Sequence, residues 1–301
     1  MPFLTITIPW SPNIVEIGPF LLTWHGLFTA AGILAGVQLA LWLARRVRYD
    51  EDDAYTLALV GVPSGIVGAR LMFVVEHWEH YGSNLLDILA IAEGGISVWG
   101  AVLGGVTGSL LFALWRHYRI RRGLDIAGAG LMLGMATGRI GDLINGEHLG
   151  RATDLPWAVI YTHPLSPAFA HSLTVGPHQP ATTYEMLGDL VILGIVIWAA
   201  LGPLRRKPGV PFFVFLVGYA AMRFLVTYLR EDSSVTPILD LRTPQLVSVL
   251  VILGSLPVVA WLLRMPAEEI DGPESDSRPQ PGRIPVGAPP VIPRESRRRR
   301  R

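Results

Sequence analysis

Residues 20–43 read FLLTWHGLFTAAGILAGVQLALWL, an apolar run without Asp, Glu, Lys or Arg. A helix that crosses the roughly 30 Å hydrocarbon core of a bilayer needs about 20 such residues. Arg45, Arg46 and Arg48 follow the run directly, and basic residues collect on the cytoplasmic side of short membrane loops. The stretch therefore predicts a membrane-spanning helix whose C-terminal end faces the cytoplasm.

Similar segments recur along the whole chain of 301 residues. Half of its residues are hydrophobic and only 16% are charged, and the mean hydropathy is +0.41, which is outside the usual balance of a soluble domain. The predicted spans are residues 20–43, 54–75, 95–115, 124–145, 184–203, 210–229 and 245–263. This pattern predicts an all-α integral membrane protein with seven transmembrane helices.

Basic clusters end only the odd-numbered spans, which sets the predicted orientation. After the first cluster they occupy residues 116–122, residues 205–207, and Arg264 together with the C-terminal tail. The positive-inside tendency then places the N-terminus outside and the C-terminus in the cytoplasm. The longest outer segment, about 146–183, contains five prolines. It is predicted to form a small, irregular periplasmic or extracellular head between helices four and five.

Composition divides the chain into two predicted parts. Residues 1–264 form the transmembrane catalytic domain, while residues 265–301 are rich in Pro, Gly, Ser and charge, which cannot bury a core. We therefore expect a disordered cytoplasmic tail whose closing arginine run is solvated or touches anionic lipid headgroups. Glycines spaced four apart within several spans predict close helix packing in lipid. The chain has no cysteine, so any thiol chemistry must use a thiol of the substrate.

Several charged side chains lie inside the predicted spans, at a cost of about 2.5 to 3.5 kcal/mol each on insertion scales. Such residues persist where they pair or line a polar cavity. A buried ion pair between Arg139 and Asp142 that only fixes helix packing is one interpretation, and a functional site is the other. The residues concerned are Arg70 in span two, Arg139, Asp142, Asn145 and Glu147 near the end of span four, and Arg223 and Arg230 in span six.

Two or three arginines near the outer leaflet favour an anionic ligand. A planar guanidinium binds phosphate through two parallel hydrogen bonds, so a phospholipid headgroup is the expected anion. The polar residues Asp142, Asn145 and Glu147 could accept hydrogen bonds from glycerol hydroxyls or hold the arginines in place. No cofactor and no metal are expected, and nucleic-acid binding has little support.

Gly138 to Arg151 read GRIGDLINGEHLGR, which resembles the signature of prolipoprotein diacylglyceryl transferases, usually Gly-Arg-x-Gly-Asn-x-x-Asn-x-Glu-x-x-Gly. Three further blocks resemble the family in the same order along the chain. They are EGGISVWGAVLGG (93–105), QPATTYE (179–185) and GYAAMRFLVTYLRED (218–232). The resemblance covers roughly residues 16–264.

The resemblance implies a transferase of the bacterial inner membrane. The enzyme would move the sn-1,2-diacylglyceryl group of phosphatidylglycerol to the lipobox cysteine of a preprolipoprotein and release glycerol 1-phosphate, the first step of lipoprotein maturation. Its partners would be phosphatidylglycerol, the lipobox peptide and the bilayer. Tyr184 and Glu185, at the start of span five, are expected to position the head or the substrate, or the aromatic ring anchors the chain at the membrane interface. The implied lipid-binding residues are Arg70, Arg139, Asp142, Asn145, Gly150, Tyr184 and Arg230, and the implied catalytic residues are His25, Arg139, Glu147 and Arg223.

Four positions depart from the family pattern. His25 replaces a Tyr in a Trp-Tyr-Gly sequence, Trp99 replaces a His, and Asp142 replaces the signature Asn. Thr227 stands where a Glu is common four residues after the arginine of span six, which removes an expected partner of that arginine. The usual general base is therefore missing. His25, with an ordinary pKa of about 6.5, and Glu147, as a carboxylate near lipid, are the two candidates.

Two other functions fit parts of the same pattern. A transporter could use the intramembrane arginines and Asp142 to line an anion or proton path, although no internal duplication is evident in the seven spans. A catalytically inactive paralogue that binds phospholipid would explain the replacements at His25, Trp99 and Thr227.

Overall fold

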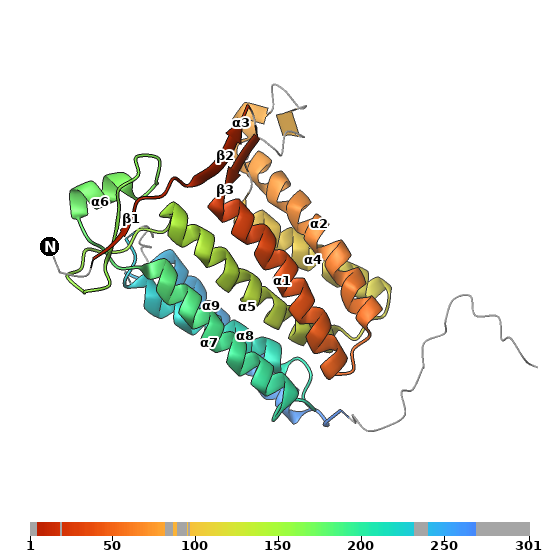
Figure 1. Ribbon diagram of the computed structural model, residues 1–301. Helices are drawn as coiled ribbons and strands as arrows, with labels where there is room; N and C mark the ends of the chain where they lie inside the picture. Colours follow the sequence, from red (N-terminus) through yellow and green to blue (C-terminus); the bar gives the residue numbers. More distant parts are fainter. Residues whose placement is uncertain are drawn as a thin grey trace, which may run out of the picture. The chain divides into compact units, whose positions relative to one another are not determined.

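The computed structural model describes residues 5–18, 20–81, 87–88, 95, 97–231 and 240–268, without the side chains of Phe20, His80, Val98 and Trp99. Its body is a bundle of long helices (Figure 1). They are α1 (Trp24–Arg46), α2 (Glu51–Glu76), α4 (Val98–Trp115), α5 (Ile120–Asn145), α7 (Ala181–Leu201), α8 (Val210–Thr227) and α9 (Thr243–Arg264). Each of the seven predicted spans overlaps one of these helices.

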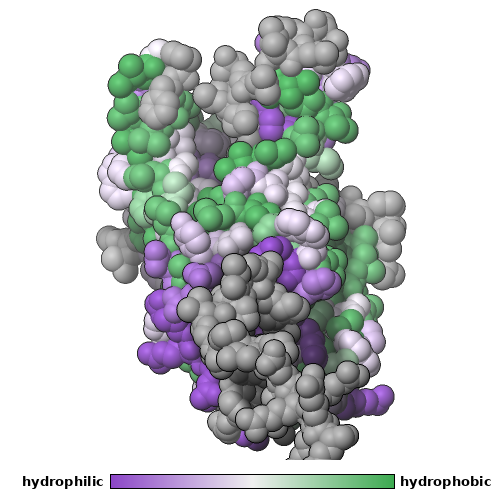
Figure 2. Space-filling view, turned by 90° about the vertical axis from the view of Figure 1, so that its right-hand side faces the viewer, coloured by the Kyte–Doolittle hydropathy of each residue, from purple (hydrophilic) through white to green (hydrophobic). Residues whose placement is uncertain are grey.

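Five of the helices, α1, α2, α7, α8 and α9, are long and apolar enough to cross a membrane. The apolar part of α4 is shorter, Gly100–Trp115, and α5 carries charged side chains near both ends. Large hydrophobic side chains such as Leu34, Val75 and Val191 face outward, and hydrophobic surface covers much of the flanks in Figure 2. The chain is a multi-pass membrane protein, while the number of seven crossings stays a prediction.

The ends of the helices follow from local capping. The Thr23 hydroxyl accepts a hydrogen bond from the backbone N–H of Gly26 at 3.0 Å and starts α1. The Asp50 carboxylate accepts one from the N–H of Asp52 at 2.8 Å and starts α2. Gly146, with φ of 82°, ends α5 in the left-handed conformation that favours glycine.

Glycines bring the helices into backbone contact, as their spacing predicts. A Cβ atom on Gly36 of α1 would lie 2.5 Å from the carbonyl oxygen of Gly130 on α5. A Cβ atom on Gly68 of α2 would overlap the carbonyl oxygen of Gly100 on α4. Only residues without side chains permit such crossings in lipid. The prediction of tight packing is confirmed for the α1–α5 and α2–α4 pairs.

The residues between α5 and α7 fold into the predicted head, together with a strand from the N-terminal segment that was not expected there. The parallel strands β1 (Ile6–Ile8) and β4 (Val159–Tyr161) pair there, beside α6 (Phe169–Val175). The antiparallel pair β2 (Asn13–Ile17) and β3 (Phe20–Thr23) precedes α1. The all-α prediction therefore needs two small two-stranded sheets added outside the helices.

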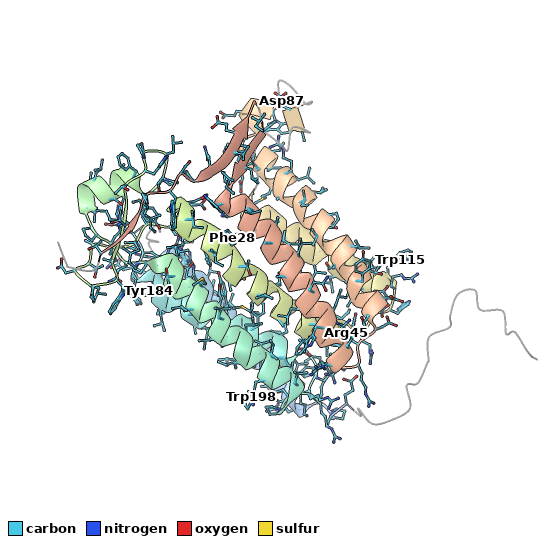
Figure 3. The ribbon with its side chains drawn as sticks, viewed as in Figure 1. Phe28, Arg45, Asp87, Trp115, Tyr184 and Trp198 are labelled. Carbon is cyan, nitrogen blue, oxygen red and sulfur yellow. The ribbon has the colours of Figure 1, made fainter. Side chains whose placement is uncertain are left out.

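Opposite ends of the helices carry different side chains. Arg45, Trp115 and Trp198 lie at one end of the bundle, and Asp87 and Tyr184 lie at the other (Figure 3). The short helix α3 (Trp78–Tyr81) follows α2. Of the predicted tail, residues 265–268 are described, and Glu268 there pairs with Arg122 at 2.6 Å. Residues 269–301 lie outside the described part of the chain.

Candidate active site

One carboxylate forms ion pairs with three of the arginines that lie inside the predicted spans. Glu185 lies one turn inside α7, and its side chain is fully buried. Its Oε2 atom is 2.8 Å from Nη2 of Arg139 on α5, and its Oε1 atom is 3.0 Å from Nη1 of Arg230, which follows α8. Arg223 on α8 pairs with the same Oε1 atom. The ends of α5, α7 and α8 on the side of the head thus meet at a single acidic side chain.

The three arginines differ in exposure. The side chains of Arg139 and Arg223 are 14% and 19% exposed, whereas that of Arg230 is 4% exposed. Each guanidinium has five N–H donors, and one carboxylate has about four acceptor positions, so three arginines bring far more donors than Glu185 can accept. Arg139 and Arg223 are therefore the two cations of this group that a further anion can reach.

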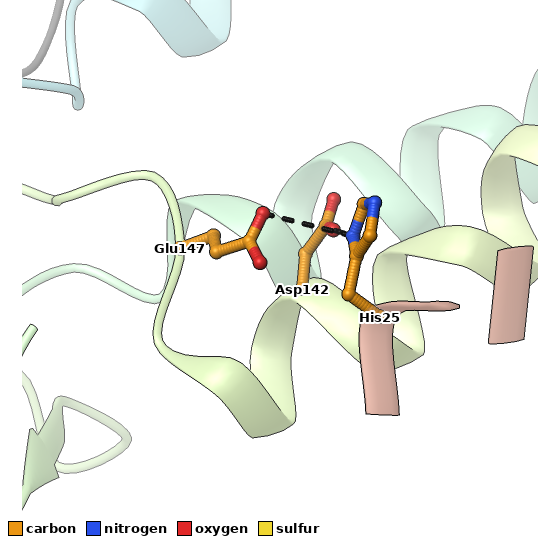
Figure 4. Close-up of side chains that lie close together, drawn as sticks. All are labelled: His25, Asp142 and Glu147. Carbon is orange, nitrogen blue, oxygen red and sulfur yellow. Dashed lines mark hydrogen bonds and ion pairs between the residues drawn. The ribbon is translucent and has the colours of Figure 1, made fainter. Parts of the chain in front are cut away.

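A second cluster adjoins the first through Asp142. The Oδ2 atom of Asp142 is 3.0 Å from Nη1 of Arg139, and its Oδ1 atom is 2.5 Å from Nδ1 of His25. Glu147 approaches the same ring nitrogen, with its Oε2 atom at 3.6 Å (Figure 4). His148 Nε2 lies 3.6 Å from Asp142. The cluster joins α1, α5 and the first residues of the head.

Gly141 explains why His25 reaches Asp142. A Cβ atom on Gly141 would lie 2.7 Å from the Cα atom of His25 and 2.7 Å from the carbonyl oxygen of Trp24. The first turn of α1 can therefore rest directly on the last turns of α5. The Thr23 cap fixes where that first turn begins. Local sequence on both helices thus brings the imidazole beside the carboxylate.

Asn145, Glu147 and Gly150 line the junction between α5 and the head. The Asn145 side-chain amide donates a hydrogen bond to Oε1 of Glu147 at 3.0 Å. The Ser166 hydroxyl donates to the Asn145 carbonyl oxygen at 2.7 Å. Gly150 forms a β-bridge with Arg230, and any side chain on it would overlap the backbone of Gln179. In this structure the position of Gly150 serves close packing beside the arginine group.

Arg70 does not join the other predicted residues. Its guanidinium donates hydrogen bonds to the carbonyl oxygens of Asp87 at 2.6 Å, Ile88 at 2.8 Å and Gly95 at 2.8 Å. It also lies 5.2 Å from the ring centroid of Tyr81. Arg70 therefore holds the chain that follows α2.

Tyr184 likewise binds the head and not the arginines. Its hydroxyl accepts a hydrogen bond from Nε1 of Trp157 at 2.7 Å and donates one to Oε1 of Gln179 at 2.9 Å. Trp157 is half exposed. This chain of contacts fits the anchoring interpretation of Tyr184.

Three further ionisable side chains belong to this site, although the sequence motifs do not mark them as such. Glu185, expected only to position the head or the substrate, pairs with the three arginines. Asp189 lies one turn further along α7. Asp189 is fully buried, and neither of its carboxylate oxygens has a hydrogen-bond partner among the described residues. His148, which follows α5, accepts a hydrogen bond from Arg230 at 2.8 Å. Because a charged side chain inside a membrane span is costly, the positions of Glu185 and Asp189 in a predicted span already indicate a functional role.

Thr227 does not leave Arg223 without a partner, contrary to the expectation from the family pattern. The Thr227 hydroxyl donates a hydrogen bond to the Arg223 carbonyl oxygen at 2.6 Å, and Glu185 from α7 pairs with the guanidinium instead. The side chain of Trp99 lies outside the described part of the chain.

The ligand atoms of His25, Asp142 and Glu147 also lie close enough to hold a metal ion, within 4.8 Å of one another. Two ligands of one ion, each about 2.1 Å from it in tetrahedral geometry, lie about 3.4 Å apart. The 2.5 Å between Nδ1 of His25 and Asp142 is shorter than that. A direct hydrogen bond accounts for the pair better than shared metal ligation does.

Comparison with known proteins agrees with the resemblance. Residues 12–261 match the family model for prolipoprotein diacylglyceryl transferase. A phosphatidylglycerol–prolipoprotein diacylglyceryl transferase of Synechococcus elongatus is 36% identical over 264 residues, which are 86% of this chain and 89% of the relative. Proteins of the same name from Symbiobacterium thermophilum and Gloeobacter violaceus are 35% and 33% identical, covering 87% and 89% of this chain and 96% and 99% of the relatives. This chain belongs to the prolipoprotein diacylglyceryl transferase family.

Proposed function

We propose that this protein transfers the sn-1,2-diacylglyceryl group of phosphatidylglycerol to the lipobox cysteine of preprolipoproteins and releases glycerol 1-phosphate. The observation that carries the proposal is the group of Arg139, Arg223 and Arg230 around the buried carboxylate of Glu185. It lies among helices that are apolar enough to cross a membrane. An anionic lipid headgroup can reach such a site from the bilayer.

The chemistry needs charge stabilisation at the phosphate. When the cysteine sulfur attacks the glyceryl carbon, the carbon–oxygen bond to phosphate breaks and negative charge grows on the phosphate oxygens. Arg139 and Arg223, the two partly exposed arginines, are the groups that would hold that charge, because preorganised donors in a low dielectric stabilise it strongly. Glu185 and Arg230 would keep both guanidinium groups in position.

The polar residues of the α5 end would bind the rest of the headgroup. Asp142, Asn145 and Glu147 offer acceptors for the hydroxyl groups of the terminal glycerol, and Gly150 shapes the turn beside them. Arg70 and Tyr184 would act indirectly, by holding the chain after α2 and the head over the site. The lipobox peptide would enter from the side of the head.

We also propose seven crossings of the bacterial inner membrane with the N-terminus outside. Two observations support this orientation. The basic residues around Arg45, Arg116 and Arg205 lie at the ends of α1, α4 and α7, where the positive-inside tendency expects the cytoplasm. The strand β1, which precedes every long helix, pairs with β4 of the head, so the N-terminal strand and the head belong to the same side.

The test uses the purified full chain in nanodiscs with phosphatidylglycerol and a synthetic lipobox peptide, followed by peptide mass. A diacylglyceryl increment is expected that a Cys→Ser peptide does not acquire. Arg139→Ala should abolish the increment, whereas Arg45→Ala, at the opposite end of the bundle, should keep it. Lipid binding without any increment would identify a phospholipid-binding paralogue, and loss of lipid binding with anion uptake in vesicles would identify a transporter. Either result would overturn the proposal.

A further inference from the structure

The arginine group accounts for the phosphate side of the reaction, and the base that removes the thiol proton is the part still to be assigned. We propose that Nε2 of His25 takes this proton and that Asp142 is the positioning residue that prepares the imidazole for it. The inference rests on the proposed function and adds a histidine–aspartate pair at the outer ends of α1 and α5. Its geometric basis is the 2.5 Å contact between Nδ1 of His25 and Oδ1 of Asp142.

Asp142 selects the tautomer of His25. An ionised carboxylate only accepts hydrogen bonds, so the short contact requires a proton on Nδ1 of His25. The lone pair of the neutral ring then lies on Nε2, the nitrogen that can accept a proton. Asp142 is itself held by Nη1 of Arg139 at 3.0 Å, which favours its ionised form. Arg139 therefore connects the phosphate site to the base.

The imidazole of His25 is only partly buried. The His25 side chain is 46% exposed, and Nε2 has no partner among the described residues. Figure 4 shows Nδ1 turned toward the two carboxylates and the second ring nitrogen on the opposite edge of the ring. A thiol on the outer side of the inner membrane can approach this edge of the ring without displacing Asp142.

Glu147 fits the role of base less well. Its Oε1 atom already accepts a hydrogen bond from the Asn145 amide at 3.0 Å. Its Oε2 atom lies 3.6 Å from Nδ1 of His25, where its negative charge stabilises the imidazolium formed after proton transfer. The charged groups that face His25 are thus Asp142, Glu147 and Arg139, with His148 beyond Asp142.

The reaction step balances in atoms and charge. The cysteine S–H proton passes to Nε2 of His25 as sulfur forms its bond to the glyceryl carbon. The carbon–oxygen bond to phosphate breaks, and its electron pair leaves with glycerol phosphate. The imidazolium then returns its proton to the released phosphate or to water, which regenerates the neutral ring. No oxidant, metal or further reactant takes part.

The test compares the pH–rate profiles of wild type, His25→Gln and Asp142→Asn in nanodiscs, with phosphatidylglycerol and a lipobox peptide. At pH 7, His25→Gln should slow transfer by about 10²- to 10⁴-fold, the usual contribution of a general base. Its rate should keep rising toward the thiol pKa of about 8.5, because the peptide must then ionise unaided. Asp142→Asn should lower kcat and also steepen the pH dependence, because an amide can force the wrong tautomer. For that mechanism, serine proteases provide a precedent.

Two controls separate this inference from the proposed function. His77→Gln, an exposed histidine at the outer end of α2, should retain the wild-type rate and profile. His25→Ala should regain activity with added imidazole, which a purely structural defect would not do. If wild type transfers the lipid but His25→Gln keeps its rate and pH profile, the inference is wrong and the function stands. If wild type transfers nothing, the proposed function itself fails.

Discussion

The Oε2 atom of Glu185 lies 2.8 Å from Nη2 of Arg139, and this contact joins α7 to α5 inside the bundle. Because Glu185 also pairs with Arg223 and Arg230, it offsets repulsion among three guanidinium groups that have little access to water. Removing one partner of a buried ion pair leaves the other partner's charge uncompensated, which costs about 3 to 5 kcal/mol.

Glu185→Gln should therefore destabilise the protein and disturb the phosphate site together. We expect a lower melting temperature in detergent. The transfer rate should fall by at least about 10²-fold, as when an enzyme loses a preorganised hydrogen-bond donor that stabilises the transition state. Glu51→Gln is the matched control, because Glu51 forms an exposed pair with Arg45, and such pairs contribute about 0 to 1 kcal/mol. An unchanged melting temperature in Glu185→Gln would contradict the assignment of Glu185 as the shared counter-ion.

Lysine replacements should distinguish an arginine that binds phosphate from one that mainly holds the site together. Arg223→Lys keeps the charge but loses the planar fork that binds phosphate, so the KM for phosphatidylglycerol should rise about tenfold while the melting temperature changes little. Arg230→Lys removes contacts of a side chain that is 4% exposed and binds both Glu185 and His148. Arg230→Lys should lower the melting temperature more than Arg223→Lys does, and it should raise the KM less. The reverse pattern would mean that Arg230 is the residue that contacts lipid.

The sequence predicts the parts of this site that depend on neighbours along one helix. Arg139 and Asp142 are three residues apart on α5, and their pairing at 3.0 Å follows from helical spacing. The apolar runs likewise predict where the long helices lie. Both inferences need only the local period of the chain.

Contacts between distant segments were not predictable in the same way. The approach of Glu185 to the arginines depends on how α7 packs against α5 and α8, and spacing along one helix does not contain that information. Arg70 carries the same intramembrane signal as Arg139, yet it binds backbone carbonyl groups after α2. The pairing of β1 with β4 joins residues about 150 positions apart. Such distant pairings leave little local pattern.

Glycine-to-alanine replacements should show where two helices pack too closely to accommodate a Cβ atom. Gly36→Ala places a Cβ atom 2.5 Å from the carbonyl oxygen of Gly130, so α1 and α5 must separate, and overpacking of this kind costs about 1 to 3 kcal/mol. The melting temperature in detergent should fall. Gly254→Ala on α9 meets open space and should leave it unchanged or raise it slightly, because alanine favours helix. Equal effects would show that the α1–α5 crossing is looser than described.

Chelation should not affect transfer. If His25 and Asp142 form a direct hydrogen bond, enzyme dialysed against EDTA should keep its full rate and contain no stoichiometric metal by elemental analysis. Added Zn²⁺ should inhibit, because the ligand atoms of His25, Asp142 and Glu147 lie within 4.8 Å of one another and imidazole suits zinc. His25→Gln should weaken that inhibition. Activity that EDTA removes and Zn²⁺ restores would replace the base mechanism with a metal-dependent one.

The head should lose stability in acid because of His178, which is 3% exposed. Burial lowers the pKa of His178 below its ordinary value of 6.5, and the nearby groups that titrate or carry charge are His171 and Glu231. The opened head binds a proton on His178 near pH 6.5 and the closed head does so only at lower pH. The stabilisation is therefore complete above about pH 6.5 and declines as the pH falls below it.

Hydrogen exchange measures this effect directly. The backbone N–H groups of Val159 and His178 donate to each other's carbonyl oxygens at 2.9 and 3.0 Å, so their protection reports on closure of the head. In wild type, the hydrogen-exchange protection factors of these two N–H groups, corrected for intrinsic exchange, should fall as the pH is lowered from about 7.5 to about 5.5. It should stay level in His178→Phe, whose ring can keep the stacking on Tyr161. Equal pH dependence in both proteins would assign the effect to another group, because the phenyl ring cannot bind a proton.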